Sequence, residues 1–320
     1  MISRSVLAAA MVGLGLLVAP DARFAIAAEG TSAPAVVVSI KPIHGLVASV
    51  MAGAARPQLL IEGVGSPHSY ALRPSQAQAL GRADLVFWMG AALERFLVKP
   101  LGALAADAMV VELSASDGVR TLATRSGGLW AGHEAEDDHS AGEAGHVDMH
   151  LWLDPRNAAA MVAAIAAALS TIDPERAALY QANATRLDAD LARLDADLAA
   201  RLAPVRDRPF VVFHDGYHYL EHRYGLNAVG SIAVDPLRRP GAGRLREIRA
   251  RLAAREVDCV FAEPQFTPAL VDTVVAGTGA RTGVLDPLGA NLDAGPAHYA
   301  LLMETLSRSL VSCLDPSRSG

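Results

Sequence analysis

The sequence predicts an α/β protein of two lobes, each with a mainly parallel sheet flanked by helices. Short apolar segments rich in β-branched residues recur along the chain, and most are followed by a helical pattern, which is typical of parallel strands buried on both faces. The chain has 320 residues, of which 52% are hydrophobic and 19% charged, so it can bury a substantial core. A chain of this length is near the size at which one core divides into two. We therefore expect two lobes with a cleft between them.

The first 28 residues have the pattern of a secretory signal peptide. Arg4 precedes an apolar run from Val6 to Ala19, and the small residues at 25–28 suit a signal peptidase. This run is shorter than the roughly 20 residues that a membrane-spanning helix needs, so a membrane anchor is the second interpretation. We expect residues 1–28 to be removed and the mature protein to be soluble and periplasmic. The full chain carries a net charge of -6, which argues against a nucleic-acid partner.

Seven segments are predicted to form strands. Four fall in an N-terminal lobe, residues 29–154, and three in a C-terminal lobe, residues 176–320. In chain order the predicted strands are Ala35–Ile40, Gln58–Ile61, Leu85–Trp88, Met109–Leu113, Phe210–Phe213, Cys259–Ala262 and Thr282–Leu285.

Helical patterns join the two lobes without a flexible linker. Asp154 and Pro155 form a helix start, and residues 155–175 are predicted to form a connecting helix. From Arg176 to Leu202 leucines recur at intervals of three and four residues, which indicates an amphipathic helix. A long rigid helical connection of this kind would resist large hinge motion.

Residues 126–148 form a segment rich in Gly, Ala, His and acidic residues, with no periodicity. One interpretation is a solvated loop. The other is an auxiliary loop that collects metal ions at low affinity, because His- and acid-rich tracts bind metals. Its histidines are His133, His139 and His146.

The two cysteines, Cys259 and Cys313, lie in the part of the chain that would be exported. In an oxidising compartment such an isolated pair favours a disulfide bond. Two buried thiols and thiolate metal ligands are the alternatives, and C-x-x-C spacing is absent.

Four candidate ligands follow predicted strands or strand-like segments: His68, His150, His214 and Asp286. In open α/β sheets ligands bind beyond the carboxyl ends of the strands, and two of the four residues fall in each half of the chain. Three imidazoles and one carboxylate complete a tetrahedral Zn²⁺ shell without an open position for a catalytic water. Such a set favours metal binding over hydrolysis.

Periodicity alone does not select these four residues, but a family resemblance does. The chain resembles the zinc-specific periplasmic solute-binding proteins of ABC-type metal importers, often called high-affinity zinc uptake proteins. The stretches that carry the resemblance follow the family's order and are Ser39–Ile43, Pro67–Ser75, Ala83–Gly90, Asp148–Pro155, Phe213–Tyr217, Ala262–Gln265 and Leu285–Leu288.

The resemblance implies that His68, His150, His214 and Asp286 bind Zn²⁺ as cargo and that a membrane permease of an ABC importer receives it. Manganese-binding relatives tend to carry Glu at the third position, so His214 implies zinc. Some zinc members have an acidic residue where this chain has Pro67. We expect a monomer that is not an enzyme. A manganese- or iron-binding protein, a metal-dependent adhesin and a secreted zinc hydrolase are the alternatives.

Two further residues carry predictions. Glu263 follows a predicted strand. It would make either a contact between the lobes or a contact with a metal-binding imidazole, because such rings usually donate their other N–H to a carboxylate or a carbonyl. His298 lies on the last predicted helix and is expected at the surface.

Overall fold

The computed structural model of the chain describes residues 1, 32–126, 128–130, 147–233, 240–254, 256–267, 269–315 and 317. By its contacts the chain divides into two units, residues 1–32 and residues 33–320. The predicted signal peptide, residues 1–28, belongs to the first unit and, apart from Met1, lies outside the described residues. The described helices and strands belong to the second unit.

The first sheet is parallel throughout its described strands and lies in the N-terminal lobe. The strands lie in the order β2-β1-β3-β4. Val37, at the centre of β1, is paired with Gln58 on one side and with Val86 on the other. The strands are β1 (Val36–Val38), β2 (Gln58–Leu59), β3 (Leu85–Trp88) and β4 (Met109–Glu112), which confirms the four predicted strands with shorter bounds at several ends.

The second sheet repeats this arrangement in the C-terminal lobe, with the parallel order β6-β5-β7-β8. Three of its strands were predicted, whereas β6 was not. Its sequence contains Gly230 and Ser231, which interrupt the apolar run that identifies a buried strand. The strands are β5 (Phe210–His214), β6 (Ala228–Ala233), β7 (Cys259–Ala262) and β8 (Arg281–Val284).

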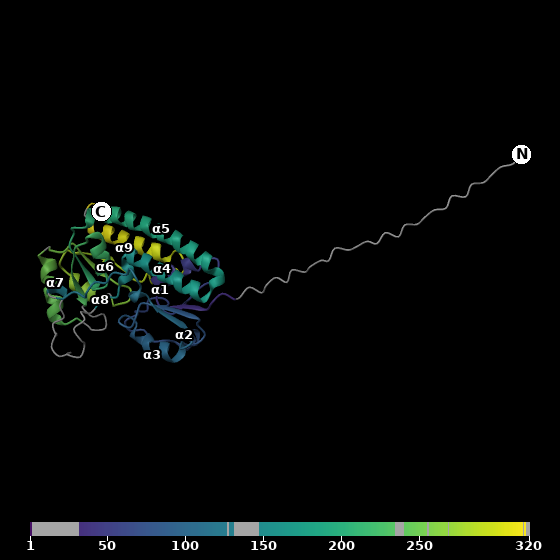
Figure 1. The fold of residues 1–320 in the computed structure, drawn as a ribbon. Coiled ribbons are helices and arrows are strands. Elements are labelled where there is room, and N and C mark those ends of the chain that lie inside the picture. Colours follow the sequence, from purple (N-terminus) through teal and green to yellow (C-terminus); the bar gives the residue numbers. More distant parts are fainter. Residues whose placement is uncertain are drawn as a thin grey trace. The chain divides into compact units, whose positions relative to one another are not determined.

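Helices cover both faces of each sheet (Figure 1). In the first lobe, α2 (Pro74–Leu80) and α3 (Arg95–Leu104) pack on one face of the sheet, where Val86 and Trp88 contact Leu80, Leu97 and Leu101. In the second lobe, α7 (Ala242–Ala253) and α8 (Ala269–Val275) pack against Val211 and Val260. Another helix, α6 (His218–Tyr224), follows β5.

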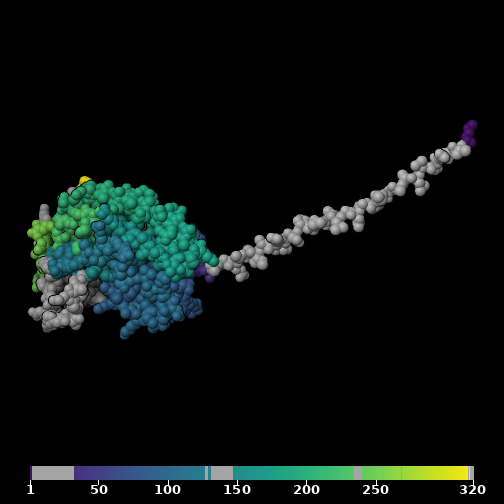
Figure 2. Space-filling view, viewed as in Figure 1, coloured from purple at the N-terminus to yellow at the C-terminus, as the bar shows by residue number. Residues whose placement is uncertain are grey.

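A group of longer helices packs together on the other faces of the sheets (Figure 1). They are α1 (Lys41–Val50), α4 (Pro155–Ile172), α5 (Ala177–Leu202) and α9 (His298–Leu314). Together they bury one core that continues from β1 and β3 of the first lobe to β5 and β7 of the second. In Figure 2 the teal surface of α4 and α5 lies above the blue surface of the first lobe.

The helix starts and faces predicted between the lobes are confirmed. Asp154 caps α4, because its Oδ1 accepts a hydrogen bond from the backbone N–H of Arg156 at 2.9 Å. In α5 the residues Leu191, Leu194 and Leu198 are buried, and this long helix joins the two lobes. By length and composition α4 could cross a membrane, yet half of it is buried inside the protein.

The predicted disulfide bond is present. Cys259 at the start of β7 is bonded to Cys313 near the end of α9, with their Cα atoms 6.1 Å apart. The bond fixes the last helix to the second sheet, at the end of β7 that is opposite to Glu263.

Candidate metal centre

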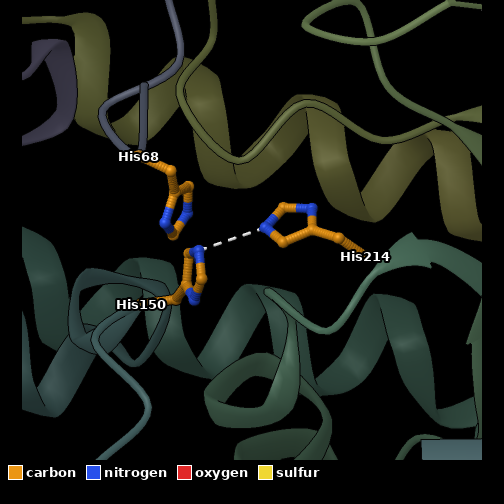
Figure 3. A group of neighbouring side chains, drawn as sticks. All are labelled: His68, His150 and His214. Atoms are coloured by element: carbon orange, nitrogen blue, oxygen red, sulfur yellow. Dashed lines mark hydrogen bonds between the residues drawn. The ribbon is translucent and has the colours of Figure 1, made fainter. Parts of the chain in front are cut away.

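Three of the four predicted ligands converge at one point. His68 comes from the loop after β2, His150 directly precedes a short 3₁₀ helix, η3 (Leu151–Leu153), and His214 is the last residue of β5. Their rings point toward one another from three separate segments (Figure 3). One nitrogen from each ring lies within 4.8 Å of the other two. This group is the three-histidine site.

The distance between two of the rings matches a shared ion. Nε2 of His150 lies 3.2 Å from Nε2 of His214. Two imidazole nitrogens that each bind a tetrahedral Zn²⁺ at about 2.0–2.1 Å are separated by roughly 3.3 Å. Without a cation, two lone pairs at this distance repel unless one nitrogen carries a proton, as in the hydrogen bond drawn in Figure 3. The distance therefore suits either a shared cation or a proton held between the two rings.

Carboxylates fix the orientation of both rings. Nδ1 of His150 lies 2.7 Å from Asp148 Oδ1, and Nδ1 of His214 lies 2.6 Å from Glu263 Oε1. Each carboxylate also accepts the backbone N–H of the same histidine. Because Nδ1–H donates to a carboxylate, Nε2 of the neutral ring presents its lone pair to the centre. The two carboxylates also carry the two negative charges that balance a divalent cation.

The environment shifts the pKa values of two rings in opposite directions. Burial lowers the pKa of His68, and the positive charges of His150 and His214 lower it further, to about 2. Burial also disfavours the charged form of His214, but the Glu263 carboxylate outweighs this effect and raises the pKa of His214. His68 is therefore ready to bind a metal at any physiological pH, and His214 holds a proton more readily in the metal-free protein.

The cavity at the centre is small, and both polar and apolar side chains line it. Its volume is about 10 Å³, the space of a single water-sized sphere. Burial of His150 and His214 away from bulk water strengthens their interaction with an ion. The cavity is lined by Ser66, Pro67, His68, His150, Trp152, His214, Glu263, Gln265, Phe266, Pro287 and Leu288.

Asp286, the fourth predicted ligand, does not belong to the group of converging ligand atoms. It lies just after β8, as expected, but its oxygens accept hydrogen bonds from four donors. Its Oδ1 accepts from Gln265 Nε2 and from the backbone N–H groups of Leu288 and Gly289, and its Oδ2 accepts from that of Ala290. In this structure Asp286 caps a turn beside the site.

The other predicted histidines lie elsewhere. His133, His139 and His146 of the proposed auxiliary loop fall outside the described residues. The prediction that His298 lies at the surface is wrong, because its side chain is fully buried. Its ring nitrogens lie 3.0 Å from the carbonyl oxygen of Asp293 and 2.9 Å from that of Leu288. Gly45 of α1 permits this close packing, since a Cβ there would lie 3.2 Å from the His298 Cβ.

Comparison with known proteins assigns the chain to a family. A family described as zinc-uptake complex component A, periplasmic, matches residues 36–313. The chain belongs to this family. Because the family is a solute-binding component of zinc uptake, the resemblance seen in the sequence motifs is confirmed over nearly the whole described fold.

Individual relatives support this assignment. The high-affinity zinc uptake system protein ZnuA of Brucella abortus (strain 2308) is 44% identical over 304 residues, covering 87% of this chain and 91% of that protein. A crystal structure of ZnuA has a TM-score of 0.76 at 25% identity and covers 88% of this chain and all of that one. A ZnuA deletion mutant with zinc bound has a TM-score of 0.73 at 25% identity, covering 88% of this chain and 98% of that one.

Asp148 and Gln265 contribute to the site, but neither was given a role from the sequence. Glu263 was predicted to contact an imidazole and does so, whereas Asp148 was not given a role. An acidic residue two positions before a ligand histidine is the available signal for Asp148. Gln265 had no signal, because its position depends on the turn that follows β8.

Proposed function

We propose that this protein captures Zn²⁺ at the three-histidine site and delivers it to the membrane permease of an ABC-type importer. Nε2 of His150, Nε2 of His214 and one ring nitrogen of His68 hold the ion, and Asp286 lies beside the site. The observation that supports this function most strongly is the 3.2 Å separation of two Nε2 atoms whose rings are fixed by carboxylates. Family membership and the zinc-bound relative support the choice of zinc.

The location follows from the same proposal. The family is periplasmic, and residues 1–28 have the composition of a signal peptide. We propose that cleavage after residue 28 releases a soluble monomer into the periplasm. The permease is its partner, and the acidic net charge gives it no affinity for nucleic acid.

The reaction is coordination without covalent chemistry. The family is a transport component. Carboxylates that could act as bases near the ion, Asp148 and Glu263, are instead hydrogen-bonded to ligand rings. A test for hydrolysis of activated esters by the zinc-loaded protein should find no turnover.

Replacing one ligand tests the proposed function. Zinc affinity of His150→Ala, measured by competition with a chelator of known affinity, should be at least about a hundredfold lower than that of the wild type, because one of three imidazoles is lost. His222→Ala removes an exposed histidine of α6 and serves as the matched control, with unchanged affinity. Equal affinity of His150→Ala and the wild type would refute the assignment.

The auxiliary loop has a separate role in this proposal. Its histidines and carboxylates collect zinc weakly and raise the local concentration of the ion near the tight site. Deletion of residues 132–145 should leave the tight phase of a calorimetric titration intact and remove weaker binding.

A further inference from the structure

Gln265 connects Asp286 with the three-histidine site. Its Nε2 donates a hydrogen bond of 2.7 Å to Asp286 Oδ1, and its side chain lines the same cavity as His150 and His214. An ionised carboxylate can only accept hydrogen bonds. Asp286 therefore requires Gln265 to present its amide nitrogen, which determines where the amide oxygen points.

The amide oxygen of Gln265 is buried, and it has no hydrogen-bond partner among the described residues. A buried acceptor without a donor destabilises the folded state unless something reaches it. Glu263, another polar residue lining the cavity, is an acceptor when ionised and cannot supply a proton. A water molecule bound to a metal ion in the cavity would be a strong donor, because the ion withdraws electrons from its oxygen.

Asp286 is held in place by its own turn. Three of its four donors are backbone N–H groups of residues 288–290. The turn is fixed from the first lobe, where Trp152 Nε1 donates to the carbonyl oxygen of Pro287 at 2.8 Å and Lys41 Nζ donates to that of Ala290 at 2.6 Å. Asp286 is thus held outside the group of converging ligand atoms, whereas Gln265, its hydrogen-bond partner, lines the cavity.

We propose that Gln265 is a positioning residue that accepts a hydrogen bond from a water molecule at the fourth coordination position of the zinc ion. Asp286 completes the site by fixing the orientation of the Gln265 amide. This inference rests on the proposed function, because it requires zinc on the three histidines. Its consequence is a fourth ligand that exchanges easily, so that a ligand of the importer can enter without first displacing a side chain.

A double-mutant cycle tests the connection. Gln265→Met keeps the side-chain volume but has no amide, and Asp286→Ala removes the carboxylate. Each variant should raise the zinc Kd by about tenfold, as is typical when a partner outside the ligand shell is lost. The double variant should bind no more weakly than either single variant, because both act through one hydrogen bond. Gln181→Met makes the same change on the exposed face of α5 and should leave the Kd unchanged.

Cobalt provides a readout that a purely structural role would not change. Azide replaces a bound water, so it should alter the visible absorption of the Co²⁺-loaded wild type. In Gln265→Met the azide concentration that gives half of the spectral change should fall by about tenfold. The bound water has lost its hydrogen-bond acceptor there and is displaced more easily. Thermal unfolding of the metal-free variants identifies any loss of affinity caused by misfolding.

A different pattern would overturn the inference. If Asp286 is itself the fourth ligand, Asp286→Ala weakens zinc binding far more than Gln265→Met does. It then has the same effect in the wild type and in the Gln265→Met variant. Azide would change the cobalt spectrum only after Asp286 is removed. Unchanged zinc affinity in both single variants would also reject it. A wild type that binds no zinc, or a His150→Ala variant that binds as tightly as the wild type, would reject the proposed function as well.

Discussion

His214 is the residue at which we expect metal preference to be decided. Imidazole suits zinc, whereas carboxylate oxygen suits harder ions such as Mn²⁺. His214→Glu should therefore lower zinc affinity by about tenfold or more and shift the preference toward Mn²⁺, as measured by competition between the two ions. The new carboxylate would lie near Glu263, which now accepts a hydrogen bond from the ring.

Charge repulsion between two buried carboxylates would complicate that comparison. Combining His214→Glu with Glu263→Gln removes the repulsion, and Glu263→Gln alone is the control. A double variant that keeps the wild-type preference for zinc would show that the third ligand does not set the selectivity.

The dependence of zinc affinity on pH should be governed by His214. Its pKa in the metal-free protein is raised by Glu263, so a proton competes with zinc from above the ordinary imidazole value of about 6.5 downward. His68, with a pKa lowered to about 2 by burial, adds no competing proton in this range. Apparent zinc affinity should fall by about tenfold per pH unit once His214 is protonated. Chelator competition between pH 8 and pH 5.5 measures this slope.

The free energy of unfolding of the metal-free protein should depend on pH in the opposite direction to zinc affinity, and should fall as the pH rises. A raised pKa of His214 in the folded state contributes stability that is fully present below about pH 6.5 and is lost as the pH rises through the folded pKa. For the prediction on zinc binding, a zinc affinity that stays constant between pH 8 and pH 5.5 would mean that His214 is not a ligand.

Among the elements, Arg125 and the first described residues of the His- and acid-rich segment 126–148 are fastened beside the site. Arg125 forms ion pairs with Asp215, the residue after His214, and with the buried Glu221 of α6. Its guanidinium also stacks over the ring of Trp130 at 3.4 Å. Leu129 packs in the core of the second lobe against β6. A segment of the first half of the chain is thereby attached to the second lobe.

Removing this attachment should destabilise the fold. Arg125→Ala leaves Glu221 buried without its counter-charge, which costs roughly 3–5 kcal/mol of unfolding free energy. Burial already raises the pKa of Glu221 to about 7, so the loss should be larger at pH 8, where the carboxyl is ionised, than at pH 6. Urea unfolding of the metal-free protein at both pH values measures it.

Arg193→Ala is the control for this prediction. Arg193 forms an exposed ion pair with Asp190 on α5, and such pairs contribute about 0–1 kcal/mol. A loss in Arg125→Ala no larger than that in Arg193→Ala would contradict the proposed attachment.

Sequence patterns located the elements unevenly. The leucine spacing of α5 and the Asp154 cap of α4 were readable because a helix repeats its buried face and its start within a few residues. Strand β6 was missed because its burial comes from β5 and from Leu129 packed onto Gly230. His298 was misplaced because α9 is buried by α1, a helix more than 200 residues away in sequence.

At the scale of the whole molecule, one core shared by both lobes limits how far they can separate. The disulfide bond adds to this by fixing α9 to the second sheet. It closes a loop whose ends are 54 residues apart, which corresponds to about 4 kcal/mol in the chain-entropy account. Reduction should lower the melting temperature of the protein, and scanning calorimetry with and without reductant measures the change.

Zinc affinity should be insensitive to the same reduction. Cys259 lies at the start of β7, whereas Glu263 follows its opposite end and holds His214. Zinc affinity measured below the lowered melting temperature should therefore stay within about threefold of its oxidised value. Two free thiols in the unfolded, unreduced protein would contradict the bond itself.

The sequence by itself determined the class of fold, most strands and helices, the three histidines and the cysteine pair. The fold class and the elements depend on local patterns, whereas the histidines came from the family resemblance and the cysteine pair from the oxidising compartment. Only the tertiary structure decided which nitrogen of His150 and of His214 faces the centre, because Asp148 and Glu263 reach Nδ1 through folded segments. It also decided that Asp286 holds Gln265, since that hydrogen bond forms only when the segments after β7 and β8 lie side by side.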